Sequence, residues 1–459
     1  MPDGQNGHDP RPSRLNLRRW LTPGIGVKRW MLVVFAGLLL LALGVAHLIR
    51  QATVDLRPTG LASDLIDLVT LQFLPFPLRG LIAAMAGVAL VVVGGYKVAR
   101  ALTEPFRSGS DEPLVELIYQ KRFLARGPRI VAIGGGTGLS TLLRGLKEHT
   151  SNLTAVVAVA DDGGSSGVLR EELGIPPVGD IRRCIAALAD AEPLMSELLQ
   201  YRFPGSTDDQ TRDGGGPLGG HAVGNLLIAA MTAVEGGDFE EGLRQMNRVL
   251  AVRGQVVPAT PTPLTLHAEL ADGTVVDGQS AIAKVASISR AWITPGDVRA
   301  STDALAAIAD AELIVLGPGS LYTSLLPSLL LPEIRDAIAA SPAIKVFVCN
   351  VATQPGETTG FDLSDHVEAL VAHAGAGIVE VVLGNNQFDA RVPAGYGNEA
   401  VRLRWPPTSV APAPRLSLED VVDPANGHHH DPARLAGALM KVFDNEGGGR
   451  RRSGVARTA

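Results

Sequence analysis

The chain has 459 residues, of which 46% are apolar and 19% are charged, and its net charge at pH 7 is −6. Disorder over most of the length is excluded, because disordered chains combine low hydrophobicity with high charge. The charge balance also indicates no nucleic-acid partner, since such proteins carry a basic domain or stripe. Two cysteines, Cys184 and Cys349, are too few for a disulfide framework or a metal quartet, so we expect reduced thiols.

Two apolar segments near the N-terminus predict a membrane hairpin. Residues 31–49 contain no charged side chain and residues 80–98 contain only Lys97, and a helix needs about 20 mostly apolar residues to span a bilayer. Buried core helices are the alternative. Basic residues are frequent in residues 1–29 and directly after residue 98, and sparser between the two segments. The positive-inside rule then places both termini and the main domain in the cytoplasm, which predicts a multi-pass protein of the cell membrane.

The rest of the chain has the pattern of an α/β domain. Continuous apolar runs, typical of buried parallel strands, predict strands at residues 129–133, 154–160, 313–316, 345–349 and 378–383. Helical stretches between them favour a Rossmann-like, doubly wound, mainly parallel sheet. The predicted organisation is a basic N-terminus at 1–29, a transmembrane hairpin at 30–98, a linker at 99–127, the α/β domain at 128–445 and a disordered tail at 446–459.

Several smaller features fill in this outline. Residues 205–220 form a polar loop, and residues 405–415 are rich in proline and extended. Alternation around the turn Asp272-Gly273 predicts a β hairpin inserted at residues 254–280. A last helix is predicted at residues 431–443, with Asp431 as its N-cap and Pro432 at its first position.

Two glycine-rich loops follow predicted strands and open helices. Residues 134–140 precede a helix predicted at 141–147, and residues 317–324 repeat the same order. Glycine lets the backbone approach a phosphate, and a helix N-terminus favours an anion. The first loop matches neither the dinucleotide fingerprint nor the Walker A motif. A tight structural turn is therefore the alternative to a ligand loop.

Acidic and imidazole side chains supply candidates for chemistry. Asp161 and Asp162 end the second strand, where adjacent carboxylates can hold a divalent cation or a ribose hydroxyl. A solvated turn is the alternative. His221 precedes an apolar helix and can act as an acid or base, or as a capping or core residue. These three residues are the catalytic candidates.

The carboxyl ends of parallel strands meet at one edge of a sheet, so these loops are expected to converge on one phosphorylated ligand. The predicted ligand-binding residues are Gly135, Gly136, Thr137, Gly138, Asp161, Asp162, Gly163, Gly164, Ser165, Ser166, Asp180, Arg182, His221, Asn225, Gly317, Gly319, Ser320, Tyr322, Thr323, Asn350, Thr353 and Glu357.

This combination of motifs resembles the YvcK/CofD-like family, also called the gluconeogenesis-factor family. The motifs that carry the resemblance are residues 134–139, 161–167, 179–182, 201–203, 220–226, 317–327 and 350–357. The resemblance implies a Rossmann-like domain that binds a nucleotide-type ligand, and in the YvcK branch a UDP-sugar such as UDP-N-acetylglucosamine. It also implies a role in cell shape and in coupling cell-wall synthesis to carbon metabolism. Two positions depart from the family pattern: Arg183 replaces a common Asn, and Gln279 replaces a common acid.

Three functions are compatible with these features. The first is a membrane-anchored UDP-sugar sensor without turnover, which implies protein partners in wall synthesis and is compatible with a homo-oligomer. The second is a CofD-like transferase of a 2-phospho-L-lactyl group, for which the resemblance implies Mg²⁺ held by Asp161 and Asp162. The third, a nicotinamide-dependent oxidoreductase, is disfavoured because the glycine spacing lacks the dinucleotide fingerprint.

Overall fold

The computed structural model describes residues 123–189, 193–205, 218–387 and 397–447, together with a few single residues before position 86. The chain divides into two compact units, Met1–Gln120 and Lys121–Ala459. Except for single positions, the predicted membrane segments at 31–49 and 80–98 lie outside the described residues. Most of the predicted linker, most of the loop at 205–220 and most of the C-terminal tail also lie outside them. No helix within the described ranges has the length and apolar character needed to cross a membrane.

A seven-stranded parallel sheet forms the centre of the second unit. Its order is β10-β9-β8-β7-β1-β2-β3, and every residue of β1, β2, β7 and β8 is buried. This burial explains the apolar runs and confirms the predicted doubly wound sheet. The strands are β1 (Ile130–Gly134), β2 (Leu153–Val157), β3 (Gln255–Pro258), β7 (Leu313–Leu316), β8 (Ile344–Val348), β9 (Val381–Asn385) and β10 (Arg415–Glu419).

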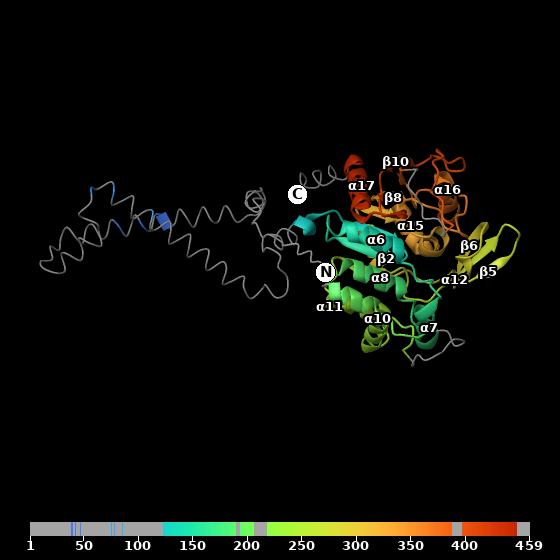
Figure 1. Cartoon of the computed structure of the whole chain (residues 1–459), viewed down its shortest axis with the longest axis horizontal. Helices are drawn as coiled ribbons and strands as arrows, with labels where there is room; N and C mark the ends of the chain where they lie inside the picture. Colours follow the sequence, from blue (N-terminus) through green and yellow to red (C-terminus); the bar gives the residue numbers. More distant parts are fainter. Residues whose placement is uncertain are drawn as a thin grey trace, which may run out of the picture. The chain divides into compact units, whose positions relative to one another are not determined.

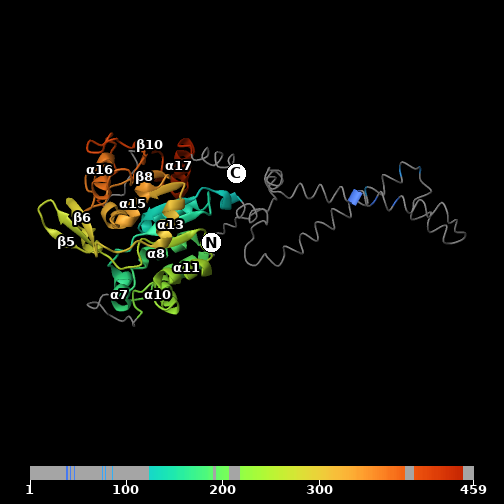
Figure 2. The ribbon, with the colours of Figure 1, turned by 180° about the vertical axis from the view of Figure 1, so that it is seen from behind.

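Helices cover both faces of this sheet (Figures 1 and 2). Along the sheet, the step from β1 to β2 runs toward β3, and the step from β7 to β8 runs the opposite way, toward β10. Crossovers between parallel strands are right-handed, so the helices that make these two steps, α6 (Thr137–Leu146) and α15 (Pro332–Ala340), lie on opposite faces of the sheet. The other helices are α7 (Gly164–Leu173), α8 (Gly179–Leu188), α9 (Pro193–Gln200), α10 (Val223–Val234), α11 (Phe239–Val249), α12 (Gln279–Ile282), α13 (Thr302–Asp310), α14 (Leu326–Leu329), α16 (Leu363–Ala374) and α17 (Pro432–Asn445).

Several predicted boundaries need correction. Helix α6 begins at Thr137 rather than at residue 141, so the end of the first glycine loop forms the first helical turn. The segment 254–280 is not one hairpin, because β3 belongs to the main sheet. The turn at Asp272-Gly273 does join β4 (Thr265–Leu270) to β5 (Val275–Asp277), and β6 (Ile288–Thr294) completes a separate antiparallel sheet.

The predicted start of the last helix is confirmed. Asp431 is the N-cap of α17, its Oδ1 accepts a hydrogen bond from the Arg434 backbone N–H at 2.8 Å, and Pro432 is the first helical residue. Cys184 and Cys349 are both free and buried, as expected for reduced thiols.

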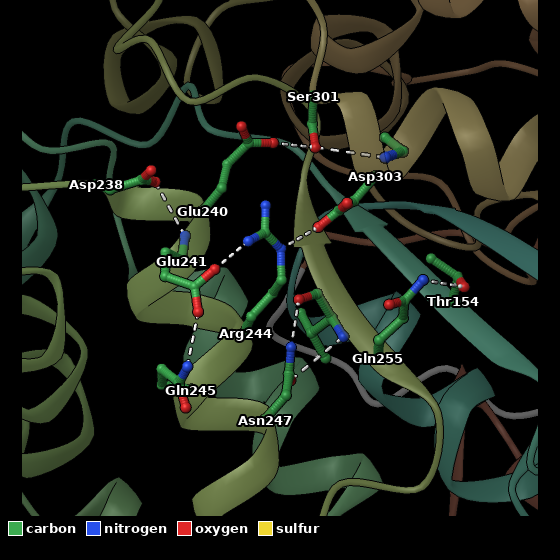
Figure 3. A network of polar contacts seen from close by, with 12 residues as sticks. Thr154, Asp238, Glu240, Glu241, Arg244, Gln245, Asn247, Gln255, Ser301 and Asp303 are labelled. Atoms are coloured by element: carbon green, nitrogen blue, oxygen red, sulfur yellow. Dashed lines mark hydrogen bonds and ion pairs between the residues drawn. The ribbon is translucent and has the colours of Figure 1, made fainter. Parts of the chain in front are cut away.

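Side chains of α11 protect the open edge of the sheet at β3 (Figure 3). Asn247 Nδ2 donates to the Val256 carbonyl at 2.9 Å, and Asn247 Oδ1 accepts from the Val256 N–H at 3.4 Å. Arg244 pairs with Asp303 at 2.8 Å, which ties α11 to α13. An edge strand otherwise presents unpaired backbone groups, so this polar network is structural.

Candidate functional site

The sheet changes direction between β1 and β7. From β1 the chain proceeds through β2 to β3, and from β7 it proceeds the other way through β8 and β9 to β10. The loops that leave β1 and β7 therefore diverge, and α/β proteins bind ligands in the crevice that such loops leave at the carboxyl ends of strands. A cavity of about 350 Å³ lies here, a size typical of small-molecule sites.

A larger hollow of about 560 Å³ lies at the other end of the sheet, at the start of β1, β2 and β3. Its lining includes Arg129, Asn152 and Asp310 and none of the predicted site residues. Because parallel α/β sheets bind ligands at the carboxyl ends of their strands, we assign the functional site to the smaller cavity.

Part of the predicted site lines this cavity. The predicted residues in its wall are Gly135, Gly136, Thr137, Gly138, Asp180, Gly319, Ser320 and Asn350. The wall also contains residues absent from the predicted set, namely Thr141, Arg183, Gln279, Pro318, Ser324, Val351, Ala352, Gln354, Asn398, His428, His429 and His430. Both glycine loops are thus brought together as expected.

The loop after β1 approaches two other segments so closely that only glycine fits. A Cβ on Gly136 would lie 2.3 Å from Asp180 Oδ1, and a Cβ on Gly138 would lie 2.4 Å from the Pro318 carbonyl oxygen. Thr137 begins α6 directly at the cavity wall. Backbone N–H groups in the first turn of a helix lack intrahelical partners and bind anions. This corner of the cavity therefore suits a phosphate group.

The loop after β7 is held in place by side chains from the loop after β8. Asn350 Nδ2 donates to the Gly319 carbonyl at 2.9 Å, and Asn350 Oδ1 accepts from the Gly319 N–H at 3.2 Å. Gln354 Nε2 donates to Ser320 Oγ at 2.7 Å. These bonds fix one wall of the cavity before any ligand arrives.

An ion pair contributes the charge at the cavity wall. Arg183 Nη1 lies 2.7 Å from Asp180 Oδ1, within α8. Burial raises the pKa of the Asp180 carboxyl above its ordinary value, and Arg183 works in the opposite direction. Arg183 is the position where the family resemblance led us to expect Asn. Asp180 and Arg183 are three positions apart, and side chains at i and i+3 are neighbours on a helix surface, so the sequence contained a signal for this pair.

Three consecutive histidines reach the cavity from the C-terminal part of the chain. They end the hairpin of β11 (Val422–Asp423) and β12 (Asn426–His430). His430 is buried, and its burial lowers the pKa to about 4. Burial and the neighbouring His429 also lower the pKa of His428. His428 and His430 are therefore neutral imidazoles at pH 7. His430 Nε2–H donates to the Cys349 carbonyl at 3.3 Å, which leaves its Nδ1 as an acceptor.

A second predicted group assembles in the protein interior, where α7 and α10 begin. Ser165 Oγ lies 3.1 Å from His221 Nδ1 and accepts a hydrogen bond from Asn225 Nδ2 at 3.0 Å. Arg182 is 4% exposed, and burial lowers its pKa to about 10. Ser165, His221 and Asn225 are thus brought together, but neither they nor Arg182 line the cavity.

The acidic strand end is engaged by backbone groups. Asp161 Oδ1 accepts from the Gly163 N–H at 3.0 Å, and Asp162 Oδ1 accepts from the Ser280 N–H at 2.9 Å. Asp162 thereby holds the start of α12 in the inserted segment. Gly163 is the N-cap of α7, and Gly164 and Ser166 lie in its first turn.

The arrangement does not fit a metal centre built from side chains of the described residues. Within those ranges no three His, Cys, Asp or Glu side chains are placed to share a metal ion. Asp161 and Asp162 instead accept hydrogen bonds from different elements.

The remaining predicted residues pack around the site. Glu357 is buried and accepts hydrogen bonds from the backbone N–H groups of Tyr322 and Thr323. Thr353 Oγ1 accepts from the Glu399 N–H at 3.0 Å. Gly317 connects β7 to the loop whose next residues line the cavity. These residues shape the loops without lining the cavity.

Comparison with known proteins agrees with this architecture. Residues 130–403 match the family model described as 2-phospho-L-lactate transferase CofD. The crystal structure of a UPF0052-family protein from Bacillus halodurans is 42% identical, with a TM-score of 0.62, and the match covers 69% of this chain and 99% of that one. The chain therefore belongs to the CofD/UPF0052 family.

Its relatives place it more narrowly among the gluconeogenesis factors. A protein of Nostoc sp. named "Putative gluconeogenesis factor" is 46% identical over 358 residues, which are 78% of this chain and 76% of that protein. The protein of the same name from Deinococcus radiodurans is 39% identical over 462 residues, which are 96% of this chain and 94% of that protein. The "Gluconeogenesis factor" of Bacillus subtilis is 48% identical over 265 residues, covering 58% of this chain and 80% of that protein.

Proposed function

We propose that the cavity between the β1 and β7 loops binds a UDP-sugar, such as UDP-N-acetylglucosamine, and that this binding regulates cell-wall synthesis and cell shape in step with carbon metabolism. The proposal rests on one observation: the backbones of the loops after β1 and β7 approach each other where the sheet changes direction, and Gly138 packs on the Pro318 carbonyl. Such a crevice is where doubly wound folds hold nucleotides.

The wall of the cavity divides into a part suited to phosphates and a part suited to polar ring substituents. The diphosphate would bind at the start of α6, where Gly136, Thr137 and Gly138 line the cavity beside Arg183. Neutral side chains, including Asn398 and the imidazoles of His428 and His430, line the rest. They can donate to and accept from the hydroxyl, amide and carbonyl groups of a sugar or a base.

The alternative is a CofD-like transferase that uses the same cavity. A transferase would consume its ligand, whereas a sensor would release it unchanged. His221 and the acids of the β2 end, which are the catalytic candidates, lie outside the cavity wall. This placement favours binding without turnover.

Calorimetry of the full chain in detergent tests the proposal. We expect UDP-N-acetylglucosamine to bind with one site per chain, NAD and GTP to bind at least tenfold more weakly, and the UDP-sugar to be recovered intact with or without Mg²⁺. The absence of UDP-sugar binding would refute the proposal. Binding followed by Mg²⁺-dependent consumption would favour the transferase.

We also propose that the predicted hairpin anchors the regulator in the cell membrane. Its support is the length of the uncharged segment at residues 31–49 and the near-uncharged segment at residues 80–98. The Deinococcus radiodurans match covers 96% of this chain and therefore extends through most of its first 120 residues.

A further inference from the structure

A smaller pocket adjoins the ligand cavity beside the start of α6. It measures about 210 Å³ and is lined by Thr137, Ser140, Thr141, Arg144, Arg183 and Gln200. Thr137, Thr141 and Arg183 also line the main cavity. The two spaces therefore share a wall at the corner assigned to the phosphates, and a ligand seated there has access to both.

This side pocket is positively charged. Arg144 projects from α6 and Arg183 from α8, and its lining contains no Asp or Glu. Arg183 forms an ion pair with Asp180, and Asp180 lines the main cavity but not the side pocket. Arg144 is exposed and has no ion pair or side-chain hydrogen bond with any of the residues that the structure describes.

The hydroxyl groups in the pocket add few free donors. Ser140 Oγ and Thr141 Oγ1 both donate to the Thr137 carbonyl, at 2.9 and 3.2 Å. The side-chain donors that remain are the two guanidinium groups, the Gln200 amide and the Thr137 hydroxyl. Guanidinium groups bind carboxylates and phosphates through paired, charge-assisted hydrogen bonds. The chemistry of the pocket therefore selects an anion rather than a neutral hydroxyl.

We propose that this side pocket binds a second anionic group of the ligand, close to its diphosphate. The group is either a carboxylate on the sugar or an additional phosphate on the nucleotide. The inference rests on the proposed function, because it places the phosphates of a nucleotide ligand at the start of α6. Arg144 is then a specificity-determining residue, since it lines the side pocket and not the main cavity.

Two matched ligand pairs test the inference by calorimetry on the full chain. UDP-glucuronate differs from UDP-glucose by one carboxylate, and UTP differs from UDP by one phosphate. We expect the wild type to bind the more acidic member of at least one pair more tightly. Arg144→Gln should reduce that preference by about three- to tenfold, the effect of one partly exposed charge-assisted contact, with little change for the less acidic member.

Arg248→Gln on α11 is the matched control, because Arg248 is exposed and lines neither space. It should leave both preferences unchanged. The wild-type preference should also shrink as salt is raised from 0.05 to 0.5 M, since ions screen exposed charges. A response of the glucuronate pair alone identifies a carboxylate, and a response of the UTP pair alone identifies a phosphate.

The result also separates this inference from the proposed function. If UDP-glucose and UDP bind but neither acidic partner binds more tightly, or if Arg144→Gln keeps the full preference, the side pocket is not an anion site and the UDP-sugar site stands. If none of the four compounds binds and UDP-N-acetylglucosamine does not bind either, both proposals are wrong.

Discussion

Asp180 is buried and also lies in the wall of the cavity between the β1 and β7 loops. Burial is the largest influence on its pKa and raises it; Asp161 adds to this effect, while Arg183 and the Gly136 backbone oppose it. A carboxyl whose pKa rises on folding stabilises the native state while it is protonated. That contribution is present at low pH and is lost as the pH rises through the folded-state pKa.

We therefore expect Asp180→Asn to raise the melting temperature above that of the wild type at pH 8, because the amide does not ionise. The gain should shrink as the pH falls from 8 to 5. Thermal unfolding at these pH values checks the expectation, and Glu172→Gln, at an exposed carboxyl on α7, serves as the control. A variant less stable than the wild type at pH 8 would mean that the ion pair with Arg183 outweighs the cost of burial.

At the scale of residues, local motifs were predictable and long-range neighbours were not. Gly136 and Thr137 line the cavity as predicted because a strand, a glycine turn and a helix form one continuous motif. His428 and His430 were missed because the C-terminal hairpin brings them to a loop almost 300 positions earlier in the chain. The only local signal was the run of three histidines itself.

At the scale of elements, Glu357 holds the turn that ends the second glycine loop. This π-helical turn, η4 (Leu321–Leu325), offers two backbone N–H groups to the Glu357 carboxylate, at 3.1 and 3.3 Å, and Thr323 Oγ1 donates to it at 2.5 Å. These donors are buried and depend on one side chain. Tyr322 and Thr323, predicted as ligand residues, therefore take part in the packing of this turn.

Glu357→Ala should destabilise the protein by about 1–3 kcal/mol for each buried donor that is left unsatisfied. Chemical denaturation measures the change, with Glu172→Ala on the surface of α7 as the control. Glu357→Gln should cost less, since its carbonyl oxygen still accepts one bond. Equal stability of Glu357→Ala and the wild type would contradict a structural role.

Strands were predictable where burial is complete and missed where it is not. β7 matches its prediction because all its residues are apolar and buried. β10 was missed because it is an edge strand with an exposed Arg415 and partly buried neighbours, so its sequence lacks a continuous apolar run. β3 was assigned to the hairpin because it is short and contiguous with the Val-rich insertion.

For the whole molecule, the proposed membrane anchor makes a testable prediction about the N-terminal segments. If residues 31–49 and 80–98 span a bilayer, the full chain should stay in the membrane pellet after extraction with alkaline carbonate and be released only by detergent. Replacing one apolar residue in the middle of each segment with Arg should shift the chain to the supernatant, because a charge near the bilayer centre costs about 3 kcal/mol. Release of the wild type by carbonate alone would contradict the anchor.

The cavity where the sheet changes direction is proposed to bind a UDP-sugar, and calorimetric titration with UDP-N-acetylglucosamine tests this proposal on the wild type and two variants. In Gly138→Ala the new Cβ would lie 2.4 Å from the Pro318 carbonyl oxygen. In Gly437→Ala, on α17, nothing lies within 4 Å of the new Cβ. We predict binding by the wild type and by Gly437→Ala, and at least a tenfold loss, about 1.4 kcal/mol, for a folded Gly138→Ala. Equal binding by all three proteins, or by none, would show that the ligand does not bind between these two loops.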